Sequence, residues 1–361
     1  MLRVAGIDPG TGSFDICILE DGRFLEGKSI PTRLVYENPK LIVDFLKEFS
    51  PLNLIAGPSG HGLPPKPLEK ASVKELSLAA LVRPEDAEQT LGLRKVFEAL
   101  KASRLPVFFL PSVKHLPTVP LHRKLNRIDL GTADKLCVAA LAIHEQAERL
   151  KMPPAEASFL LIEVGYAFTA LLRVEGGEVV AGFGGTSGPI GLLSSGRMDG
   201  EVAYLLGRVK KKTLASGGLL HASGLREGQI DFFLEGVARG EAMFKAVWEA
   251  FLEEILGFTA WLEASTGKPR EILVSGRLSK FPQIFEELAG RLSQISPVRR
   301  LKGFTSKVKE AAQGAALLAD GLAGGKHSPL VDALKIKQAS GTVLDHVYLD
   351  GFEEVRKRML D

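Results

Sequence analysis

The sequence has little cysteine, almost no net charge and no long apolar run. Its 361 residues include only two cysteines, Cys17 and Cys137, which excludes a disulfide scaffold, and no Cys or His spacing indicates a zinc site. Lys and Arg (46) outnumber Asp and Glu (43) by three, so we expect neither nucleic acid nor an anionic membrane as the main partner. No apolar stretch reaches the ~18 residues that a membrane-spanning helix needs.

The first residues run through a short apolar segment directly into Asp8. They lack the long apolar core and the small-residue cleavage site of a secretory signal, and together with the scarce cysteines this predicts a cytoplasmic protein. Apolar residues make up 45% of the chain and charged residues 25%, as in ordinary globular proteins. Because a single core rarely extends over so long a chain, we expect two domains.

An internal repeat supports two domains built on one plan. Residues 4–27 and 159–182 each read as an apolar strand, an acidic residue, a glycine-bearing turn, a second strand, a tight turn and a third strand. Four positions match at a displacement of 155 residues (163 − 8): Asp8, Gly10, Gly22 and Gly27 correspond to Glu163, Gly165, Gly177 and Gly182. We therefore predict domains over 1–151 and 152–329, with a tail over 330–361 that packs on the first domain.

Strands followed by amphipathic helices predict an α/β fold with mixed sheets. Expected helices cover 39–49, 85–101, 132–151, 240–265, 282–294 and 307–323, and expected strands cover 52–56, 107–110 and 271–274.

The first repeat contains Asp8-Pro9-Gly10-Thr11-Gly12-Ser13. Backbone N–H groups in such a turn form a concave anion site, and Gly10 and Gly12 let a phosphate approach closely. Because a carboxylate repels phosphate, Asp8 would act through Mg²⁺ or its waters, while Thr11 and Ser13 would add hydroxyl donors. The alternative is a plain hairpin in which Asp8 only caps the turn.

On these residues the chain resembles the superfamily of acetate and sugar kinases, heat-shock chaperones and actin. The resemblance implies two ribonuclease-H-like (actin-like ATPase) domains with mixed β-sheets, and ATP with Mg²⁺ in an interdomain cleft. The resemblance also implies that Asp8 to Ser13 form the first phosphate loop and Glu163 to Thr169 the second. It implies that Glu163 is a metal ligand in addition to Asp8. The second loop departs from the family pattern: Glu replaces Asp, and Tyr166 and Ala167 replace two glycines.

Three further segments resemble motifs of that superfamily. The segment with Ser275, Gly276 and Arg277 resembles the adenosine motif, although a plain strand-to-helix turn would look the same. Residues 311–316 resemble the small-residue helix that follows it, for which tight packing is an equal explanation. Residues 129–135 resemble the start of the interdomain helix, where Asp134 is either a ligand or, like Thr132, a helix cap.

Two glycine-rich segments, 184–188 and 196–200, resemble the carboxylate kinases within the superfamily, and the chain as a whole resembles an archaeal family labelled predicted butyrate kinase. The resemblance implies catalytic roles for Arg197, Asp199 and Asp134, although a loop arginine such as Arg197 is often only a solvated charge. The residues implied in nucleotide binding are Asp8, Gly10, Thr11, Gly12, Ser13, Glu163, Gly165, Thr169, Gly184, Gly185, Thr186, Ser275, Gly276 and Arg277.

The function that follows is an ATP-dependent phosphotransferase that forms an acyl phosphate on a short-chain carboxylate such as butyrate or acetate. A carboxylate is already ionised at pH 7 and needs no general base, which favours it over a sugar hydroxyl. The alternatives are an ATP-binding conformational switch of the same fold and a regulatory or structural subunit with little transferase activity. A homodimer is left open.

Overall fold

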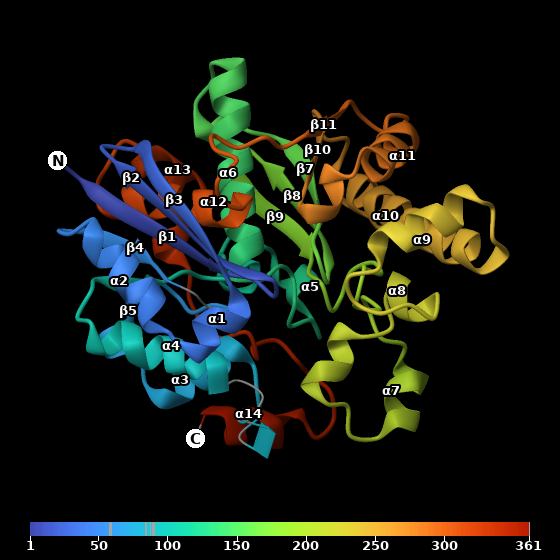
Figure 1. Ribbon diagram of the computed structural model, residues 1–361, viewed down its shortest axis with the longest axis horizontal. Helices are drawn as coiled ribbons and strands as arrows, with labels where there is room; N and C mark the ends of the chain where they lie inside the picture. Colours follow the sequence, from blue (N-terminus) through green and yellow to red (C-terminus); the bar gives the residue numbers. More distant parts are fainter. Residues whose placement is uncertain (58–59, 84, 87, 89–90, 361) are drawn as a thin grey trace. The chain divides into compact units, whose positions relative to one another are not determined.

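The computed structural model describes residues 1–57, 60–83, 85–86, 88 and 91–360. Its contacts divide the chain into two compact units (Figure 1). The first unit comprises Met1–Ser158, Val174–Ala181 and Lys302–Asp361, and the second comprises Phe159–Arg173 and Gly182–Leu301. Residues 302–329, which we expected in the second domain, group with the N-terminal residues by these contacts.

The first unit is built on a mixed sheet that has six strands among the described residues, in the order β3-β2-β1-β4-β6-β5. The strands are β1 (Arg3–Pro9), β2 (Ser13–Glu20), β3 (Arg23–Pro31), β4 (Leu54–Ala56), β5 (Lys66–Pro67) and β6 (Val107–Phe109). Strands β1, β2 and β3 form an antiparallel meander, whereas β4 runs parallel to β1 and β6 runs parallel to β4. The carboxyl end of β1, where Asp8 lies, therefore shares a sheet edge with the carboxyl ends of β4 and β6.

The helices of this unit are α1 (Thr32–Glu37), α2 (Lys40–Glu48), α3 (Val73–Ala80), α4 (Leu91–Ala102), α5 (Leu121–Lys124), α6 (Ala133–Leu150), α12 (Glu310–Leu322), α13 (Ser328–Ala333) and α14 (Phe352–Leu360) (Figure 1). Helices α1 and α12 lie directly against strands of the sheet, whereas α14 packs on α3. The apolar core joins Phe14 and Ile16 of β2 to Ile42 of α2 and Val96 of α4. Helix α12 lies against both β1 and α6, although it begins three hundred residues after β1.

The second unit contains a mixed sheet with five described strands in the order β11-β10-β7-β8-β9. The strands are β7 (Phe159–Val164), β8 (Thr169–Glu175), β9 (Glu178–Phe183), β10 (Ile272–Ser275) and β11 (Val298–Arg300). Its helices are α7 (Gly200–Leu206), α8 (Leu219–Ala222), α9 (Ile230–Ala238), α10 (Ala242–Thr266) and α11 (Pro282–Leu292). Strand β10 runs parallel to both β7 and β11.

The two sheets have the same strand order: each places its third, second, first and fourth strands side by side, followed by a further parallel strand. The tight turns of the two repeats also agree. Asp21 and Gly22 have φ values of 47° and 67°, and Gly176 and Gly177 have φ values of 55° and 72°. Positive φ at both central residues is the conformation that a two-residue hairpin loop requires. The predicted α/β fold with two mixed sheets is confirmed.

The predicted helices match α2, α4, α6, α10, α11 and α12 with shifts of a few residues at their ends, and parts of the expected helix over 85–101 lie outside the described residues. No helix among the described residues combines the length and the apolar character needed to cross a membrane.

Candidate functional site

The first loop is a short turn that joins two paired strands. Strands β1 and β2 place Asp8 opposite Asp15, and the N–H of Gly10 donates to the carbonyl of Ser13 at 3.0 Å. The Thr32 hydroxyl ties the loop to α1 by donating to the Gly10 carbonyl at 2.7 Å. The tip of the loop, Thr11 and Gly12, is exposed. The loop thus has a fixed base and an open tip with backbone N–H groups.

A lysine that the sequence analysis did not single out lies on this loop. The ammonium of Lys309, the residue that precedes α12, is 2.7 Å from Oδ2 of Asp8 and 3.1 Å from Oδ2 of Asp15. It also donates to the carbonyl of Ser13 at 2.9 Å. The Ser13 hydroxyl, which we expected to serve as a phosphate donor, donates to Asp15 at 2.7 Å.

Gly10 makes room for this ammonium. A Cβ atom at Gly10 would lie 2.2 Å from Nζ of Lys309. The sequence predicts that Gly10 makes room for a phosphate, whereas in this structure the space beside Gly10 is filled by the lysine. Any side chain at position 10 would displace Lys309 from Asp8.

The charges of this cluster shift one another's pKa values. Burial raises the pKa of Asp8, which is 7% exposed; the Lys309 ammonium opposes this rise, and the carboxylates of Asp134 and Asp15 add to it. Burial would lower the pKa of Lys309, but Asp8 and Asp15 outweigh it and raise the pKa above its ordinary value. Asp8 therefore lies in a site that still favours additional positive charge.

Asp134 belongs to this electrostatic environment. It lies in the first turn of α6, where it accepts a hydrogen bond from the Thr132 hydroxyl at 2.5 Å and pairs with Lys135 at 2.8 Å. Burial raises its pKa, but Lys135, Thr132 and Lys309 outweigh burial and hold the pKa below its ordinary value. Thr132 occupies the N-cap position without a side-chain capping bond, so neither it nor Asp134 is explained by capping alone.

Close packing of α12 brings Lys309 to the loop. A Cβ at Gly6 of β1 would lie 2.2 Å from the backbone nitrogen of Ala316, and one at Gly314 would lie 1.7 Å from the carbonyl oxygen of Cys137 in α6. The small residues of 311–316 thus let α12 lie against both β1 and α6, which supports the packing explanation of that segment.

The second loop repeats the first in its backbone. The N–H of Gly165 donates to the carbonyl of Phe168 at 2.9 Å, the same bond as Gly10 to Ser13 displaced by 155 residues. Glu163, at the end of β7, is in register with Ser275 at the end of β10. The hydroxyls of Ser275 and Thr169 are buried and have no hydrogen-bond partner among the described residues.

Two residues of the proposed adenosine motif contact this second loop. Gly276 has a φ of 90°, and a Cβ there would lie 2.4 Å from the carbonyl oxygen of Val164. The guanidinium of Arg277 lies 4.7 Å from the ring centroid of Tyr166. Burial, followed by the nearby carboxylate of Glu227, raises the pKa of Tyr166. The structure therefore brings Glu163, Gly165, Thr169 and the Ser275–Arg277 turn together within the second unit.

The glycine-rich segment after β9 is joined to the same loop. A Cβ at Gly185 would lie 2.5 Å from Cβ of Phe168, and the N–H of Ser194 donates to the carbonyl of Ala167 at 3.0 Å. Gly184 is buried and Thr186 is half-buried. These residues therefore share the surroundings of the second phosphate loop.

Arg197 and Asp199 have structural partners of their own. The Arg197 side chain is 63% exposed, lies 3.8 Å from Glu254, and places its guanidinium 5.2 Å from the ring centroid of Phe258. Asp199 caps α7 by accepting the N–H of Glu201 at 2.8 Å and that of Val202 at 3.3 Å. The capping role competes with the catalytic role that we expected for Asp199, whereas Arg197 keeps an accessible charge.

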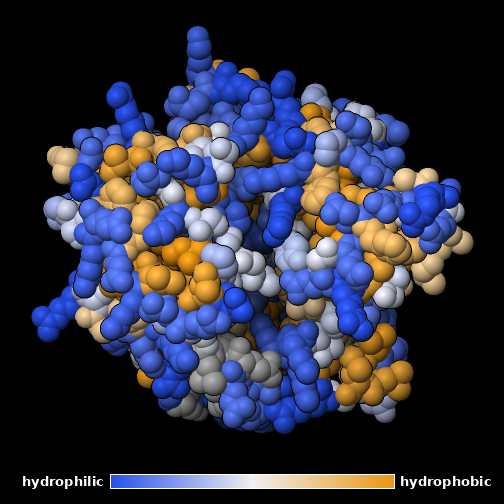
Figure 2. Space-filling model, in the orientation of Figure 1, coloured by the Kyte–Doolittle hydropathy of each residue, from blue (hydrophilic) through white to orange (hydrophobic). Residues whose placement is uncertain are grey.

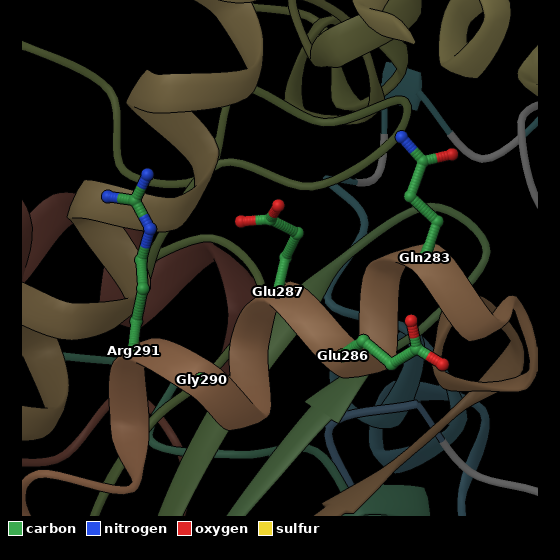
Figure 3. A pocket seen from close by; sticks show the side chains of 5 residues that line it. All are labelled: Gln283, Glu286, Glu287, Gly290 and Arg291. Atoms are coloured by element: carbon green, nitrogen blue, oxygen red, sulfur yellow. The ribbon is translucent and has the colours of Figure 1, made fainter.

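Helix α7 carries exposed apolar side chains after this cap (Figure 2, orange, lower right). They are Val202, Tyr204, Leu205 and Leu206. A separate depression of about 500 Å³ lies along α11 and is lined by Gln283, Glu286, Glu287, Gly290 and Arg291 (Figure 3). Arg291 at its end pairs with Glu249 of α10 at 2.7 Å. This depression includes none of the residues predicted from the sequence.

The chain belongs to the family described as "Protein of unknown function (DUF1464)", whose model matches residues 6–349. No curated protein matches its sequence. Among solved structures, a propionate kinase from Francisella tularensis is 14% identical with a TM-score of 0.62, over 87% of this chain and 99% of that one. Acetate kinases from Entamoeba histolytica and Porphyromonas gingivalis are each 12% identical with TM-scores of 0.58. The match to the Entamoeba histolytica enzyme covers 81% of this chain and 87% of that one. The match to the Porphyromonas gingivalis enzyme covers 87% of this chain and 98% of that one. At such identity these likenesses show the fold.

Proposed function

We propose that the protein is an ATP-dependent phosphotransferase whose acceptor is a short-chain carboxylate. The observation that carries the proposal is the loop after β1, in which a buried carboxylate, Asp8, lies at the end of a strand beside a turn with an exposed glycine tip. The fold that the chain shares with acetate and propionate kinases supports the same class of reaction. Phosphoryl transfer depends mainly on positioning and on stabilising charge, and both repeats supply such loops.

The first loop would hold phosphate oxygens through its exposed tip. The backbone N–H groups of Thr11 and Gly12 and the Thr11 hydroxyl are the donors that remain there, because the Ser13 hydroxyl is used by Asp15. Gly10 fixes the base of the loop. We assign Asp8 to the metal side of this site.

The residues fit a magnesium ion that arrives with a nucleotide. Mg²⁺ usually keeps several waters and takes one or two carboxylates together with substrate phosphates. No group of three or more His, Cys, Asp or Glu side chains in the described part of the chain is arranged to hold a metal ion, and in our proposal phosphate oxygens and water complete the coordination of an ion at Asp8. The ion would neutralise charge on the phosphates during transfer.

In the second unit, the Glu163 loop and the Gly276 turn would bind the nucleotide. Thr169 and Ser275 offer buried hydroxyls without hydrogen-bond partners among the described residues, and we assign both to nucleotide binding, with Gly165 and Arg277 beside them. Gly184, Gly185 and Thr186 would support this loop from the following segment. We also propose that Glu163 shares the metal role of Asp8.

The chemical step needs little from the protein beyond charge and position. A carboxylate oxygen of the acceptor would form a bond to the γ-phosphorus while the bond from that phosphorus to the β–γ bridging oxygen breaks, which releases ADP. The accessible guanidinium of Arg197 would stabilise the charge on the group in transfer. Asp134 would orient water or the metal's hydration shell, and Asp199 would position the Arg197 segment through its cap on α7.

The test is a coupled ADP-release assay with Mg²⁺ and ATP against acetate, propionate, butyrate, glycerol and a set of sugars. We expect ADP release only with carboxylates, and trapping with hydroxylamine should yield the matching hydroxamate. Release only with a polyol or sugar would contradict the carboxylate acceptor. A chain that shows no thermal stabilisation by ATP and Mg²⁺ would contradict the proposed class, because ligand at 100 times its Kd should add about 2.7 kcal/mol.

A second candidate is an ATP-dependent conformational switch, and the Tyr166–Arg277 pair favours it. A stacked aromatic ring occupies the loop at a position where the family pattern has glycine. The variant E163D distinguishes the candidates. A rise in turnover would indicate a native loop adjusted away from catalysis, whereas a fall would favour the transferase.

A further inference from the structure

The Lys309 ammonium is coordinated in the way a small cation would be. Its three protons are used by three oxygens: Oδ2 of Asp8 at 2.7 Å, the Ser13 carbonyl at 2.9 Å and Oδ2 of Asp15 at 3.1 Å. All three oxygens belong to the first loop and its two strands. The ammonium therefore has no proton left for a phosphate while it stays in this position.

Both the backbone and the side chain of Lys309 are held in place by neighbouring residues. Its backbone N–H donates to Oδ1 of Asp15 at 3.2 Å, so Asp15 holds the main chain and the side chain together. The missing side chain at Gly10 leaves the space that Nζ occupies. The close packing of Gly6 and Gly314 fixes α12, whose start Lys309 marks. A freely moving surface lysine has none of these restraints.

The cluster is close to electrically balanced before any ligand arrives. Three carboxylates, those of Asp8, Asp15 and Asp134, face two ammonium groups, those of Lys309 and Lys135. A free divalent cation at Asp8 would have to displace Lys309 and lose some of its water. In return, the cluster offers it a net charge of only about −1, because three carboxylates already face two ammonium groups. The negative charge of a nucleotide phosphate at the exposed tip would change that balance in favour of the metal.

We propose that Lys309 is the resident cation of the first loop, which keeps free divalent metal off Asp8 and Asp15 so that metal enters only together with phosphate. The statement that metal enters together with phosphate rests on the proposed function, because it assumes that a nucleotide binds here. The exclusion of free metal concerns the protein alone. Lys309 acts on the metal through the two carboxylates and is a positioning residue.

The experiment measures Mn²⁺ binding to the nucleotide-free protein from the amplitude of the free-ion electron paramagnetic resonance signal. We compare the wild type with K309M, which keeps the stem and removes the charge. We expect weak binding to the wild type and binding at least about tenfold tighter to K309M, equivalent to ~1.4 kcal/mol. K307M is the matched control: Lys307 lies two residues earlier and pairs with Glu26 at 2.7 Å, away from Asp8. It should leave Mn²⁺ binding unchanged.

A second variant covers the case in which K309M does not fold. K309Q also removes the charge, but its amide can still donate to Asp8 and to the Ser13 carbonyl, so it should fold and bind Mn²⁺ at least about tenfold more tightly than the wild type. Equal Mn²⁺ affinity of the wild type and of the charge-removed variant that folds overturns the inference. A gain in K307M as large as the gain in that variant also overturns it, because the effect would then not depend on the position of the charge.

A second arm adds ADP to the wild type. Mn²⁺ binding should then appear together with ADP binding. Tight Mn²⁺ binding to the wild type without ADP overturns the exclusion of free metal. Absence of any ADP binding, with exclusion intact, contradicts the proposed function and leaves the role of Lys309 towards free metal standing. Calorimetry of ADP with and without Mn²⁺ separates these two results.

Discussion

Gly314 of α12 lies directly against Cys137 of α6: a Cβ at position 314 would be 1.7 Å from the Cys137 carbonyl oxygen. Neither backbone can give way easily, because α12 is held on its other side by β1. The contact therefore fixes where α12 begins, and with it the position of Lys309. We expect G314A to lower the free energy of unfolding by about 3 kcal/mol or more, since overpacking against backbone is at the high end of such costs.

The control for this substitution is G257A. Gly257 lies within α10, is exposed, and has no atom within 4 Å of the Cβ that would be added. Alanine there should stabilise the protein by about 0.5–1 kcal/mol, the usual helix preference over glycine. Urea unfolding of both variants measures the difference. Equal free energies of unfolding for G314A and G257A would mean that α12 does not pack closely against the backbone of α6.

A similar pair of glycines tests the second loop. Gly276 and Gly267 have φ values of 90° and 82°, so alanine is strained at both, but only Gly276 contacts backbone, at 2.4 Å from the Val164 carbonyl oxygen. We expect G276A to lose more stability than G267A, by at least about 1 kcal/mol. Under the proposed function, G276A should also weaken ADP binding at least tenfold by calorimetry, whereas G267A should not. Unchanged ADP affinity in G276A would remove that turn from the nucleotide site.

The sequence predicts the features that depend on local chemistry. The paired hairpins follow from Asp-Gly and Gly-Gly turns and from alternating apolar residues, and their turns adopt the expected positive φ values. The backbone bond of Gly10 to Ser13 and its repeat from Gly165 to Phe168 follow from the same spacing. These elements could be predicted because the conformation of each hairpin is determined by residues close together in the sequence.

The cluster around Asp8 could not be predicted in the same way. Lys309 is three hundred residues from Asp8, and a lysine before a helix has no local feature that distinguishes it from a solvated charge. The available signal was indirect: the small residues of 311–316 indicate that α12 packs against backbone, and whatever precedes such a helix lies close to its partner. The cap formed by Asp199 was missed for a different reason: we expected a catalytic role for Asp199 and no helix after it, whereas an aspartate directly before a helix typically caps it, as it does here.

His115 makes stability depend on pH. Its ring is 2% exposed, and its Nδ1 accepts the N–H of Ser112 at 3.1 Å. Burial lowers the pKa of His115 to about 4 from the ordinary 6.5, although Ser112 and Asp345 oppose the shift. Below pH 6.5 the unfolded chain binds a proton that the folded chain does not, so the stability that is fully present above pH 6.5 is lost as the pH falls towards 4. Between pH 7 and 5 the loss from this group is about 2 kcal/mol.

The variant H115N should remove that loss, because the asparagine oxygen can accept the Ser112 N–H and does not titrate. We expect the difference in urea midpoint between pH 7 and pH 5 to shrink in H115N. His144 has a pKa lowered to about 4 by burial and by His327, so part of the pH dependence should remain. H221N, at an exposed histidine, is the control and should match the wild type. A steeper slope in H115N than in the wild type would contradict the assignment.

Asp8 itself distinguishes a functional loop from a structural one. In D8N the side chain keeps its shape but loses the charge that pairs with Lys309 at 2.7 Å. Because Asp8 is buried and Lys309 is only partly exposed, we expect a loss of stability of about 1–3 kcal/mol as well as a loss of turnover with Mg²⁺ and ATP of at least about a hundredfold. E26Q removes the partner of Lys307, an exposed pair, and should change neither quantity appreciably. Calorimetry of ADP binding to folded D8N decides between the two roles of Asp8. If Asp8 is purely structural, the ADP affinity in Mg²⁺ should be the same in D8N as in the wild type. If Asp8 orients the metal, ADP binding to D8N should no longer depend on Mg²⁺.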